Sequence, residues 1–506
     1  MKNSLNREIL EGYRPFINSN DYLNHKSNYT KIPEKETSDK VINLNGIDEL
    51  FEKYIHDGMT LSFHHHLRNG DEVLNMVLGE LVKRKIKNIH LASSGVFPNN
   101  DNALIKAIEE GCVTSITTNY LNGKSSEVIG KGKLKGLITL ETHGGRARSI
   151  ETGELKIDLA IISASCLDKL GNATGKVGPN ACGVLGYAIP DLHYAKKVLV
   201  ISDTIVEKLD DYEIEAKYVD YVLNVASIGD SKGIISGTTN ITKDPVGLKI
   251  ARDATKLLVE LGVIKEGFSM QTGAGGTSLA VASYIKKEML KNNIKGSFAS
   301  GGITSYYVDM LHEGLFDCLE DVQCFDLDAV KSSLSDKNHK MMDASKYGNP
   351  FYCPNPVVNG LDLVVLGATE IDTNFNVNVV TDSFGKIIGG SGGHSDTANG
   401  AKITMITTSL IRARIPVIKE HVTTISTPGE DVDILVTDRG IAINPKRSDL
   451  LEKLKGTKLN IMPIENLLKI AHSITGIPKK IEQSNEIIGL VKYRDGTIID
   501  SIYRLK

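Results

Sequence analysis

A glycine-rich turn at residues 270–278, MQTGAGGTS, is one of four segments of this sequence with the composition of a binding site. Its glycines are Gly273, Gly275 and Gly276. Glycine lets the backbone approach a ligand closely, and a helical pattern follows, which Thr277 or Ser278 can cap. The first N–H groups of that helix would face an anion or a developing oxyanion. The turn is neither a P-loop nor a dinucleotide-binding fingerprint. A tight strand-to-helix turn without a ligand is the alternative.

A second glycine-rich segment spans residues 389–401, GGSGGHSDTANGA, and contains five glycines. Its candidate site residues are Gly390, Ser391, Gly392, Gly393, His394 and Asp396. So much glycine in an ordered domain costs backbone entropy, which a bulky ligand lying against the main chain would explain. A flexible surface loop is the alternative, although an apolar run at 403–407 follows at once.

Three consecutive histidines, His64, His65 and His66, stand with Arg68 in the segment LSFHHHLR. In an extended chain they alternate between faces, so at most two of them point the same way. Because no cysteine or carboxylate lies at ligand spacing, we expect no metal here. The segment instead predicts a strand that ends in a turn, with hydrogen-bond donors for a carboxylate substrate.

Two arginines, Arg146 and Arg148, stand beside a Gly-Gly turn in the segment ETHGGRAR. A guanidinium can bind a carboxylate or phosphate through two parallel hydrogen bonds. A solvated surface turn is an equally good interpretation of the segment.

The bulk composition excludes several classes of protein. Hydrophobic residues make up 41% and charged residues 24%, with a net charge of -3. This charge favours neither nucleic acid nor a membrane surface as a partner. No apolar run approaches the roughly 18 residues of a membrane span, and no signal peptide is evident. Six scattered cysteines without a CxxC pair fit a reducing cytoplasm, where we expect the protein.

Apolar runs that alternate with amphipathic helical patterns predict an α/β fold with a largely parallel sheet. Strand-like runs occur at 86–92, 159–163, 197–202, 361–366 and 403–407, and helical patterns at 71–85 and 279–291. Residues 1–40 are polar and lysine-rich, so we expect an extended arm that orders only against a partner.

The sequence also contains an internal repeat. The segment that begins at Asp158 aligns without a gap with the one that begins at Asp362, and both the pair Asp168/Asp372 and the pair Asn172/Asn376 coincide. Three further matches follow the same order at nearly the same offset: 57–63 with 266–272, 87–96 with 295–303, and 191–202 with 396–407. We therefore predict two similar halves, domain 1 at 41–240 and domain 2 at 241–506, with the site in the cleft between them.

These segments resemble the CoA-transferase superfamily. Residues 273–310 resemble its glycine turn, helix and strand followed by Gly-Ile-His-Thr-Glu, and residues 389–402 resemble its Gly-Val-Gly-Gly-Gln-Val-Asp-Phe segment. Residues 434–447, ILVTDRGIAINPKR, resemble its Val-Thr-Glu-Tyr-Gly-Val-Ala segment. Together with the arm, GMTLSFHHHLRNGD, LETHGGRARS and SASCLDKLGNATG, the chain is similar over nearly its whole length to the citrate lyase alpha subunit.

The resemblance implies exchange of acetyl for citryl on an acyl-carrier thiol. Many superfamily members form a covalent thioester on a glutamate, but the alignment places Tyr306 at that position. This departure agrees with direct attack by a citrate carboxylate, which gives a mixed anhydride. Glu370 is the remaining carboxylate that could act covalently, and we expect it to be a hydrogen-bonding residue instead.

The resemblance also implies roles for the candidate residues. Gly275, Gly276, Gly392 and Gly393 would donate backbone N–H groups to oxyanions, and His394 and Asp396 would orient the substrate or the pantetheine arm. His64, His65, His66, Arg68, Arg146 and Arg148 would bind citrate. Gly273, Thr277, Ser278, Gly390, Ser391 and Asp396 would line the thioester.

The implied partners are citrate, acetate, a beta subunit that cleaves the citryl thioester, and a gamma subunit, the acyl carrier, in a homo- and hetero-oligomer. The thioester is acetyl-CoA or the phosphoribosyl-dephospho-CoA group of the carrier, and no metal is expected. One alternative is a short-acid CoA-transferase that uses Glu370. The other is a non-catalytic metabolite-binding protein on the same fold, which also hosts sugar-phosphate isomerases.

Overall fold

Two largely parallel sheets form the framework of the molecule in a computed structural model, which describes residues 1–38, 40–235, 240–273, 275–479 and 484–506. The first sheet has the order β1-β11-β9-β6-β2-β3-β4-β5-β25-β26. Its strands are β1 (Ile42–Leu44), β2 (Thr60–Phe63), β3 (Ile89–Ser93), β4 (Val113–Thr118), β5 (Ile138–Leu140), β6 (Leu159–Ser163), β9 (Lys197–Ser202), β11 (Tyr221–Asn224), β25 (Ile487–Lys492) and β26 (Ile498–Tyr503).

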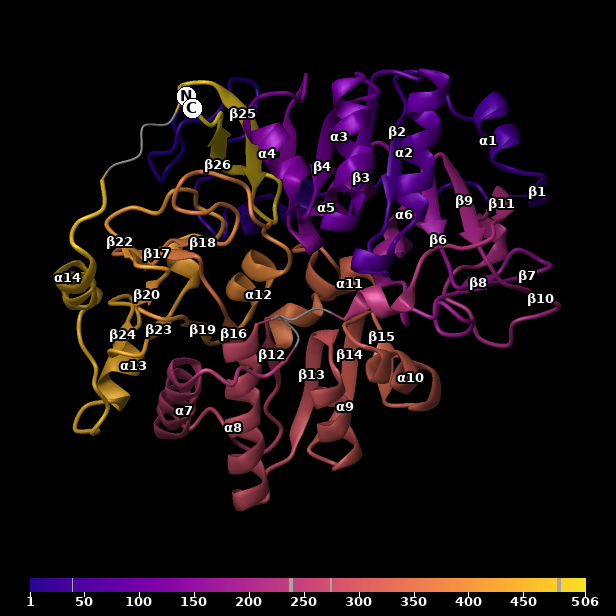
Figure 1. The fold of residues 1–506 in the computed structure, drawn as a ribbon. Helices are drawn as coiled ribbons and strands as arrows, with labels where there is room; N and C mark the ends of the chain where they lie inside the picture. The colour runs from indigo at the N-terminus through magenta and orange to yellow at the C-terminus, as the bar shows by residue number, and fades with distance from the viewer. Residues whose placement is uncertain (39, 236–239, 274, 480–483) are drawn as a thin grey trace.

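The second sheet has the order β15-β14-β13-β12-β16-β19-β23-β24. Its strands are β12 (Met270–Thr272), β13 (Gly296–Ile303), β14 (Phe316–Cys324), β15 (His339–Met341), β16 (Leu363–Leu366), β19 (Thr404–Thr407), β23 (Ile434–Val436) and β24 (Ile441–Ile443). The sheets lie one above the other in Figure 1, with the indigo-to-magenta half above and most of the orange half below.

Helices cover both sheets, which explains why central strands such as β6 and β16 are buried along their whole length. Those of the first half are α1 (Ile47–Lys53), α2 (Val73–Arg84), α3 (Asp101–Glu109), α4 (Lys124–Gly130), α5 (His143–Glu151) and α6 (Ile189–Tyr194). Those of the second half are α7 (Pro245–Glu260), α8 (Gly276–Asn292), α9 (Ser305–His312), α10 (Leu327–Ser335), α11 (Ala344–Gly348), α12 (His394–Gly400), α13 (Ser448–Lys453) and α14 (Ile464–Thr475). No helix in the described part of the chain has the length and apolar character needed to cross a membrane.

The two sheets repeat one topology, as the predicted duplication requires. The order β5-β4-β3-β2-β6-β9-β11 in the first corresponds strand by strand to β15-β14-β13-β12-β16-β19-β23 in the second. Each half also carries a small three-stranded sheet. These are β10 (Ile205–Val206), β7 (Cys166–Asp168) and β8 (Ala173–Thr174) in one half, and β22 (Ile418–Lys419), β17 (Glu370–Asp372) and β18 (Val377–Asn378) in the other.

The repeated Asp and Asn residues form the same turn in both halves. Asp168 Oδ1 accepts from the backbone N–H of Asn172 at 2.9 Å, and Asn172 Nδ2 returns a bond to Asp168 Oδ2 at 3.0 Å. Asp372 and Asn376 repeat both bonds at 2.9 and 3.1 Å. In both halves, the Asp and the Asn therefore stabilise a local turn rather than take part in chemistry.

The C-terminal hairpin departs from the predicted division of the chain. Strands β25 and β26 fall within 241–506, yet β25 pairs in parallel with β5 of the first sheet. The hairpin covers an edge of that sheet, which would otherwise expose unpaired backbone groups. Figure 1 shows the C-terminus next to this hairpin. The other predicted domain boundaries stay predictions.

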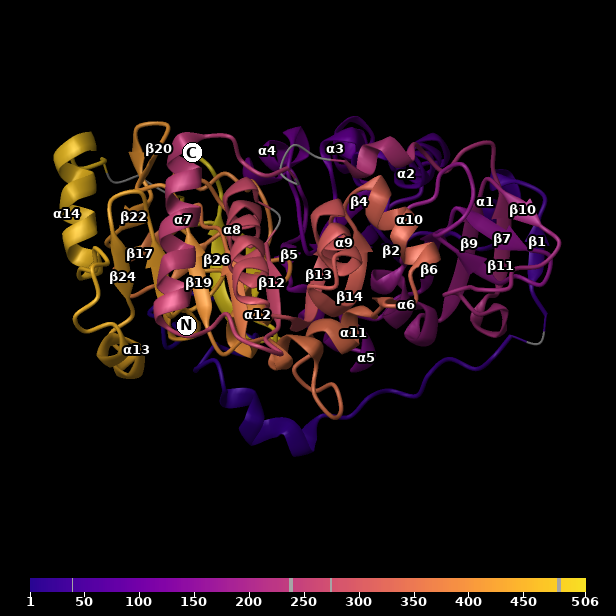
Figure 2. The ribbon, with the colours of Figure 1, turned by 90° about the horizontal axis from the view of Figure 1, so that it is seen from below.

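The N-terminal arm docks on its own chain, so the expectation that it orders only against a partner was wrong. Phe16 is 1% exposed and packs edge-to-face on Tyr493 of the hairpin at 5.0 Å. Farther along, Tyr29 stacks on Phe351 of the second half, and Lys35 pairs with Asp220 of the first half. Figure 2 shows the indigo arm crossing outside the other elements before it reaches β1. Contacts with both halves and with the hairpin fix its path.

Candidate active site

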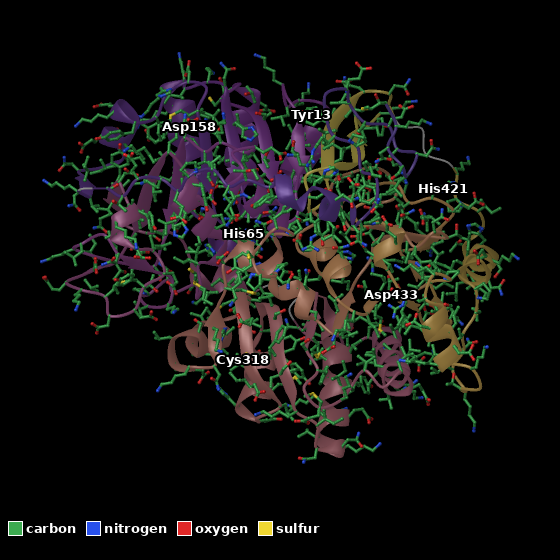
Figure 3. All side chains as sticks on the ribbon, turned by 180° about the vertical axis from the view of Figure 1, so that it is seen from behind. Tyr13, His65, Asp158, Cys318, His421 and Asp433 are labelled. Carbon is green, nitrogen blue, oxygen red and sulfur yellow. The ribbon has the colours of Figure 1, made fainter. Side chains whose placement is uncertain are left out.

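The turns that follow the strands of the two sheets meet at the junction between the halves. The N–H of His143, after β5, donates to the carbonyl of Gly392 at 2.8 Å. Gln323, at the end of β14, donates through Nε2 to the carbonyl of His65 at 2.9 Å. Figure 3 shows His65 where the violet half meets the salmon half. The carboxyl ends of parallel strands are the usual place for ligands in such sheets.

Buried polar atoms without a partner gather at this junction. Within the described residues, no hydrogen bond is made by either ring nitrogen of His64 and His66, by Nδ1 of His143 or by Oε1 of Gln323. The imidazoles of His143 and His66 lie beside the ring of Tyr187, with centroids 4.5 and 6.0 Å away. Unsatisfied buried polar groups are costly, so such a cluster indicates a site that a polar ligand completes.

Arg68 carries the free positive charge of this cluster. Its guanidinium lies 5.4 Å from the centroid of Phe97 in the first half and 4.8 Å from that of Phe325 in the second. Nε and Nη1 have no hydrogen-bond partner in the described part of the chain, and the backbone has φ 52°, a strained value for arginine. Burial lowers the pKa of Arg68, yet a guanidinium stays protonated in proteins. A strained, unpaired and stacked arginine is suited to clamp a carboxylate.

The histidines around Arg68 are neutral at physiological pH. Burial lowers the pKa of His64 to about 4 and that of His143 to about 3, and it brings the pKa values of His65 and His66 well below 6.5. Each neutral ring offers one donor and one acceptor. These rings can therefore offer hydrogen bonds but no charge.

A small cavity beside this cluster contains a buried carboxyl group. Asp71 lines it together with Arg68 and Phe97. Burial raises the pKa of Asp71 to about 7, although backbone N–H groups at the start of α2 oppose the shift. A carboxyl group that is partly protonated at neutral pH repels an anionic substrate less than an ionised one would.

The other two predicted arginines are already neutralised by acidic partners. Arg146 binds both carboxylate oxygens of Asp191, at 2.8 and 3.0 Å, and Ser62 shares the contact. Arg148 pairs with Glu154 at 2.7 Å. Both arginines are buried, but neither has a free charge for a tricarboxylate.

The second glycine-rich segment packs against the first half. A Cβ atom on Gly390 would lie 2.0 Å from the carbonyl oxygen of Asn119, and one on Gly393 would lie 2.1 Å from the hydroxyl of Tyr347. Protein atoms, rather than a ligand, therefore require glycine at these two positions. The side chain of Ser391 is buried with no partner for its hydroxyl among the described residues.

His394 and Asp396, at the start of α12, are held by protein partners. Thr427 contacts Nδ1 of His394 at 2.7 Å, and the carbonyl of Gly367 accepts from its Nε2 at 3.0 Å. Burial lowers the pKa of this imidazole to about 4, so it is neutral. Asp396 accepts from Thr142 Oγ1 at 2.8 Å and from the N–H of Gly144 at 2.9 Å, which ties the second half to the first.

The first glycine-rich turn has more room than the second. A Cβ atom on Gly273 would meet nothing closer than 3.6 Å, and one on Gly275 nothing closer than 3.9 Å. Thr277 and Ser278 lie in the first turn of α8, which has 17 residues. Ala274 lies outside the described residues. This turn is therefore open to a ligand on the side that Gly273 and Gly275 face.

Glu370 and Tyr306 are the two residues considered for the covalent nucleophile, and neither is placed to attack a thioester. Glu370 is fully buried, and its carboxylate accepts from Ser383 Oγ at 2.6 Å, Asn378 Nδ2 at 3.0 Å and the N–H of Thr423 at 2.7 Å. Tyr306 lies at the start of α9 with its hydroxyl 3.5 Å from the carbonyl of Ala282. The structure thus brings His64, His65, His66 and Arg68 together at the junction but gives Glu370 a structural environment.

Several junction residues were not predicted from the sequence: Phe97, His143, Tyr187, Gln323 and Phe325. His143 stands inside the ETHGGRAR motif, where the arginines drew attention instead. Gln323 is 258 residues from its partner His65, and no local pattern signals the contact.

Known proteins resemble this chain over most of its length. A family model described as citrate lyase, alpha subunit, matches residues 39–505. The citrate lyase alpha chain of Haemophilus influenzae is 42% identical over 491 residues, which are 96% of this chain and 98% of that protein. The corresponding chain of Klebsiella pneumoniae is also 42% identical, over 89% of each protein.

Solved structures agree with this similarity. The alpha subunit of citrate lyase from Streptococcus mutans, in complex with citrate, has a TM-score of 0.94 and 41% identity and covers 100% of both chains. A Pseudomonas malonate decarboxylase hetero-tetramer in complex with malonate has a TM-score of 0.61 at 14% identity over 92% of both chains, which shows a shared fold.

Proposed function

The chain belongs to the citrate lyase alpha-subunit family, which makes it a citrate CoA-transferase, and we propose that its reaction takes place in the polar cluster where the two halves meet. The observation that carries this proposal is Arg68, a buried guanidinium without a carboxylate partner among the described residues. A citrate carboxylate would supply the missing partner. The related Streptococcus mutans structure contains citrate, which supports a citrate site in this chain.

Citrate needs more than one charged contact, because it carries three carboxylates. Arg68 binds one of them through its free Nε and Nη1 groups. His64, His66 and His143 are neutral, and each has a ring nitrogen without a hydrogen-bond partner among the described residues, although His64 Nε2 lies 3.8 Å from Asp191 Oδ2. They would donate hydrogen bonds to the other two carboxylates. In a site closed off from water, such preorganised donors stabilise developing charge more strongly than water does.

The chemistry we propose passes acyl groups directly between substrates. A citrate carboxylate attacks the carbonyl of the acetyl thioester, which releases the carrier thiolate and leaves a mixed citric–acetic anhydride. The thiolate then attacks the citryl carbonyl, and acetate departs. No enzyme carboxylate is needed, which fits the saturated hydrogen bonding of Glu370 and the presence of Tyr306 in place of a glutamate. The protein holds the reactants in position.

The thioester would enter along the open glycine turn. Gly275 and Gly276 begin α8, so their N–H groups are the better candidates for an oxyanion. The N–H of Gly392 already donates to the carbonyl of Asn119 at 3.3 Å, which leaves it less available. We expect the thioester to be the phosphoribosyl-dephospho-CoA group of an acyl carrier subunit, with a beta subunit completing the lyase complex in the cytoplasm. The free cysteines agree with that compartment.

The test is a transfer assay with the purified chain, acetyl-CoA and citrate. Citryl-CoA and acetate are followed by mass spectrometry, with borohydride and hydroxylamine trapping in parallel. We expect citryl-CoA without any glutamyl adduct. A trapped adduct on Glu370 would keep the transferase but overturn the direct route. Transfer only to acids other than citrate would overturn the assignment of the cluster to citrate.

A further inference from the structure

A second cluster of chemically capable side chains lies at the end of β14, apart from the histidine cluster. Asp321 and Cys324 belong to β14 and His339 begins the neighbouring strand β15. His339 Nε2 is 2.9 Å from Asp321 Oδ2, and Cys324 Sγ is 3.1 Å from the same oxygen. One ligand atom from each residue lies within 4.8 Å of the others, and all three residues are buried.

The other side of the His339 ring is held by residues outside the cluster. Ser332 Oγ is 2.8 Å from His339 Nδ1, and it donates to Asp336 Oδ2 at 2.6 Å. These contacts orient the ring so that Nε2 faces the carboxylate of Asp321.

The candidate ligand atoms converge in the interior, because Nε2 of His339 and Sγ of Cys324 both contact Oδ2 of Asp321. Asp321 is held in place by the N–H of Gln323, which donates to Oδ1 at 2.8 Å. Nitrogen, oxygen and sulfur ligands that converge in a buried site suit Zn²⁺.

We propose that Asp321, Cys324 and His339 are the three protein ligands of a zinc site, with a water molecule in the fourth position. A tetrahedral site with bonds of about 2.0–2.3 Å separates such ligand atoms by about 3.3–3.6 Å, so Nε2 of His339 and Sγ of Cys324 each need move only about half an ångström away from Asp321 Oδ2. The bond from His339 to Ser332, backed by Asp336, is the kind of outer contact that orients metal-bound imidazoles.

A metal bound by this cluster would also affect the candidate active site, because the two are connected through β14. Gln323, whose side chain donates to His65, stands between two of the proposed ligands. Gly183 of the first half packs so closely on Cys324 that a Cβ atom there would lie 2.2 Å from Sγ. A metal that fixes the end of β14 would therefore also fix the junction between the halves. The proposed zinc ligands are different residues from those of the proposed citrate site.

The test is the metal content of the purified full-length chain after expression in zinc-supplemented medium. We expect about one zinc per chain by inductively coupled plasma mass spectrometry, lost in Cys324→Ser and His339→Gln. Cys318→Ser is the matched control, because Cys318 lies on the same strand but away from His65 (Figure 3), and it should keep the metal.

Cobalt provides a measurement that does not depend on the variants folding. Chain expressed with Co²⁺ in place of Zn²⁺ should show thiolate-to-cobalt charge-transfer absorption in the near ultraviolet. A wild-type chain with far less than one zinc and no such band would overturn the proposal. Equal zinc in Cys324→Ser and wild type would also overturn it.

Discussion

The turns after β2 and β12 occupy the same place in the repeated fold but have opposite chemistry. The first carries three histidines and Arg68, whereas the second carries three glycines and an open N-terminus of α8. In the proposed reaction, the first half would supply side chains that bind a small polyanion, and the second would supply space and backbone for a larger group. Two turns at equivalent places of the repeated fold would then serve different parts of one reaction.

The aspartates that begin α6 and α12 show the same divergence. Asp191 neutralises Arg146 within its own half, whereas Asp396 reaches across to Thr142 and Gly144 of the other half. Burial raises the pKa of Asp191, but Arg146, His64 and Ser62 together outweigh burial, and the pKa falls below its ordinary value. Burial dominates for Asp396, and its pKa rises to about 6. Equivalent positions therefore serve internal packing in one half and the junction in the other.

The largest effect is expected in the turn after β2, where a substitution tests whether its side chains bind citrate. Replacing Arg68 with Gln removes one partner of a buried charge pair, which costs about 2–5 kcal/mol, or about 30- to 4,000-fold in kcat/KM for citrate. The matched control is Arg252→Gln, on α7, whose side chain is 52% exposed and which should change nothing. Steady-state kinetics would contradict the assignment if both variants kept wild-type kcat/KM.

The two aspartates should respond to pH with opposite signs. The raised pKa of Asp396 means that its ionisation is unfavourable in the folded state, so stability is lost as pH rises from about 4 to about 6, by up to about 3 kcal/mol. Asp396→Asn should weaken this dependence. The depressed pKa of Asp191 stabilises the fold above its unfolded value, and that stability is lost on acidification. The measurement is the free energy of unfolding of wild type and Asp396→Asn across this pH range. Identical pH profiles for the two proteins would contradict the role given to Asp396.

The two glycine-rich segments should separate a packing role from a ligand role. Gly390→Ala drives a Cβ atom into the backbone of Asn119 and should cost about 1–3 kcal/mol of stability. Gly275→Ala meets open space and should change stability by only about 0.5 kcal/mol, yet raise KM for the thioester. Thermal unfolding and steady-state kinetics of both variants distinguish the packing role from the ligand role. A destabilised Gly275→Ala with normal KM would reverse the roles assigned to the two segments.

The smallest effect on catalysis is expected at Glu370. Its carboxylate is occupied by Ser383, Asn378 and Thr423, so Glu370→Gln should keep kcat within a few-fold of wild type while it lowers thermal stability. A loss of turnover at unchanged stability, measured on the same preparation, would instead indicate a chemical role for this carboxylate.

The sequence was sufficient to predict the scaffold. Apolar runs of strand length alternate with helical periodicity, which is a local signal of an α/β fold. The repeat predicts two similar halves, because its matching segments lie at a nearly constant offset in the chain. The cluster of His64–His66 with Arg68 could be predicted for the same reason, since its members are adjacent in the chain.

Only the tertiary structure decided which of these groups are free to act. Arg68, Arg146 and Arg148 look equivalent in sequence, but Asp191 and Glu154 neutralise two of them. The C-terminal hairpin, the docked arm and the meeting of Asp321 and Cys324 with His339 likewise depend on which segments the fold brings together. Charge pairing, burial and ligand geometry act over a few ångströms in space, whatever the separation along the chain, and so they could not be predicted from spacing alone.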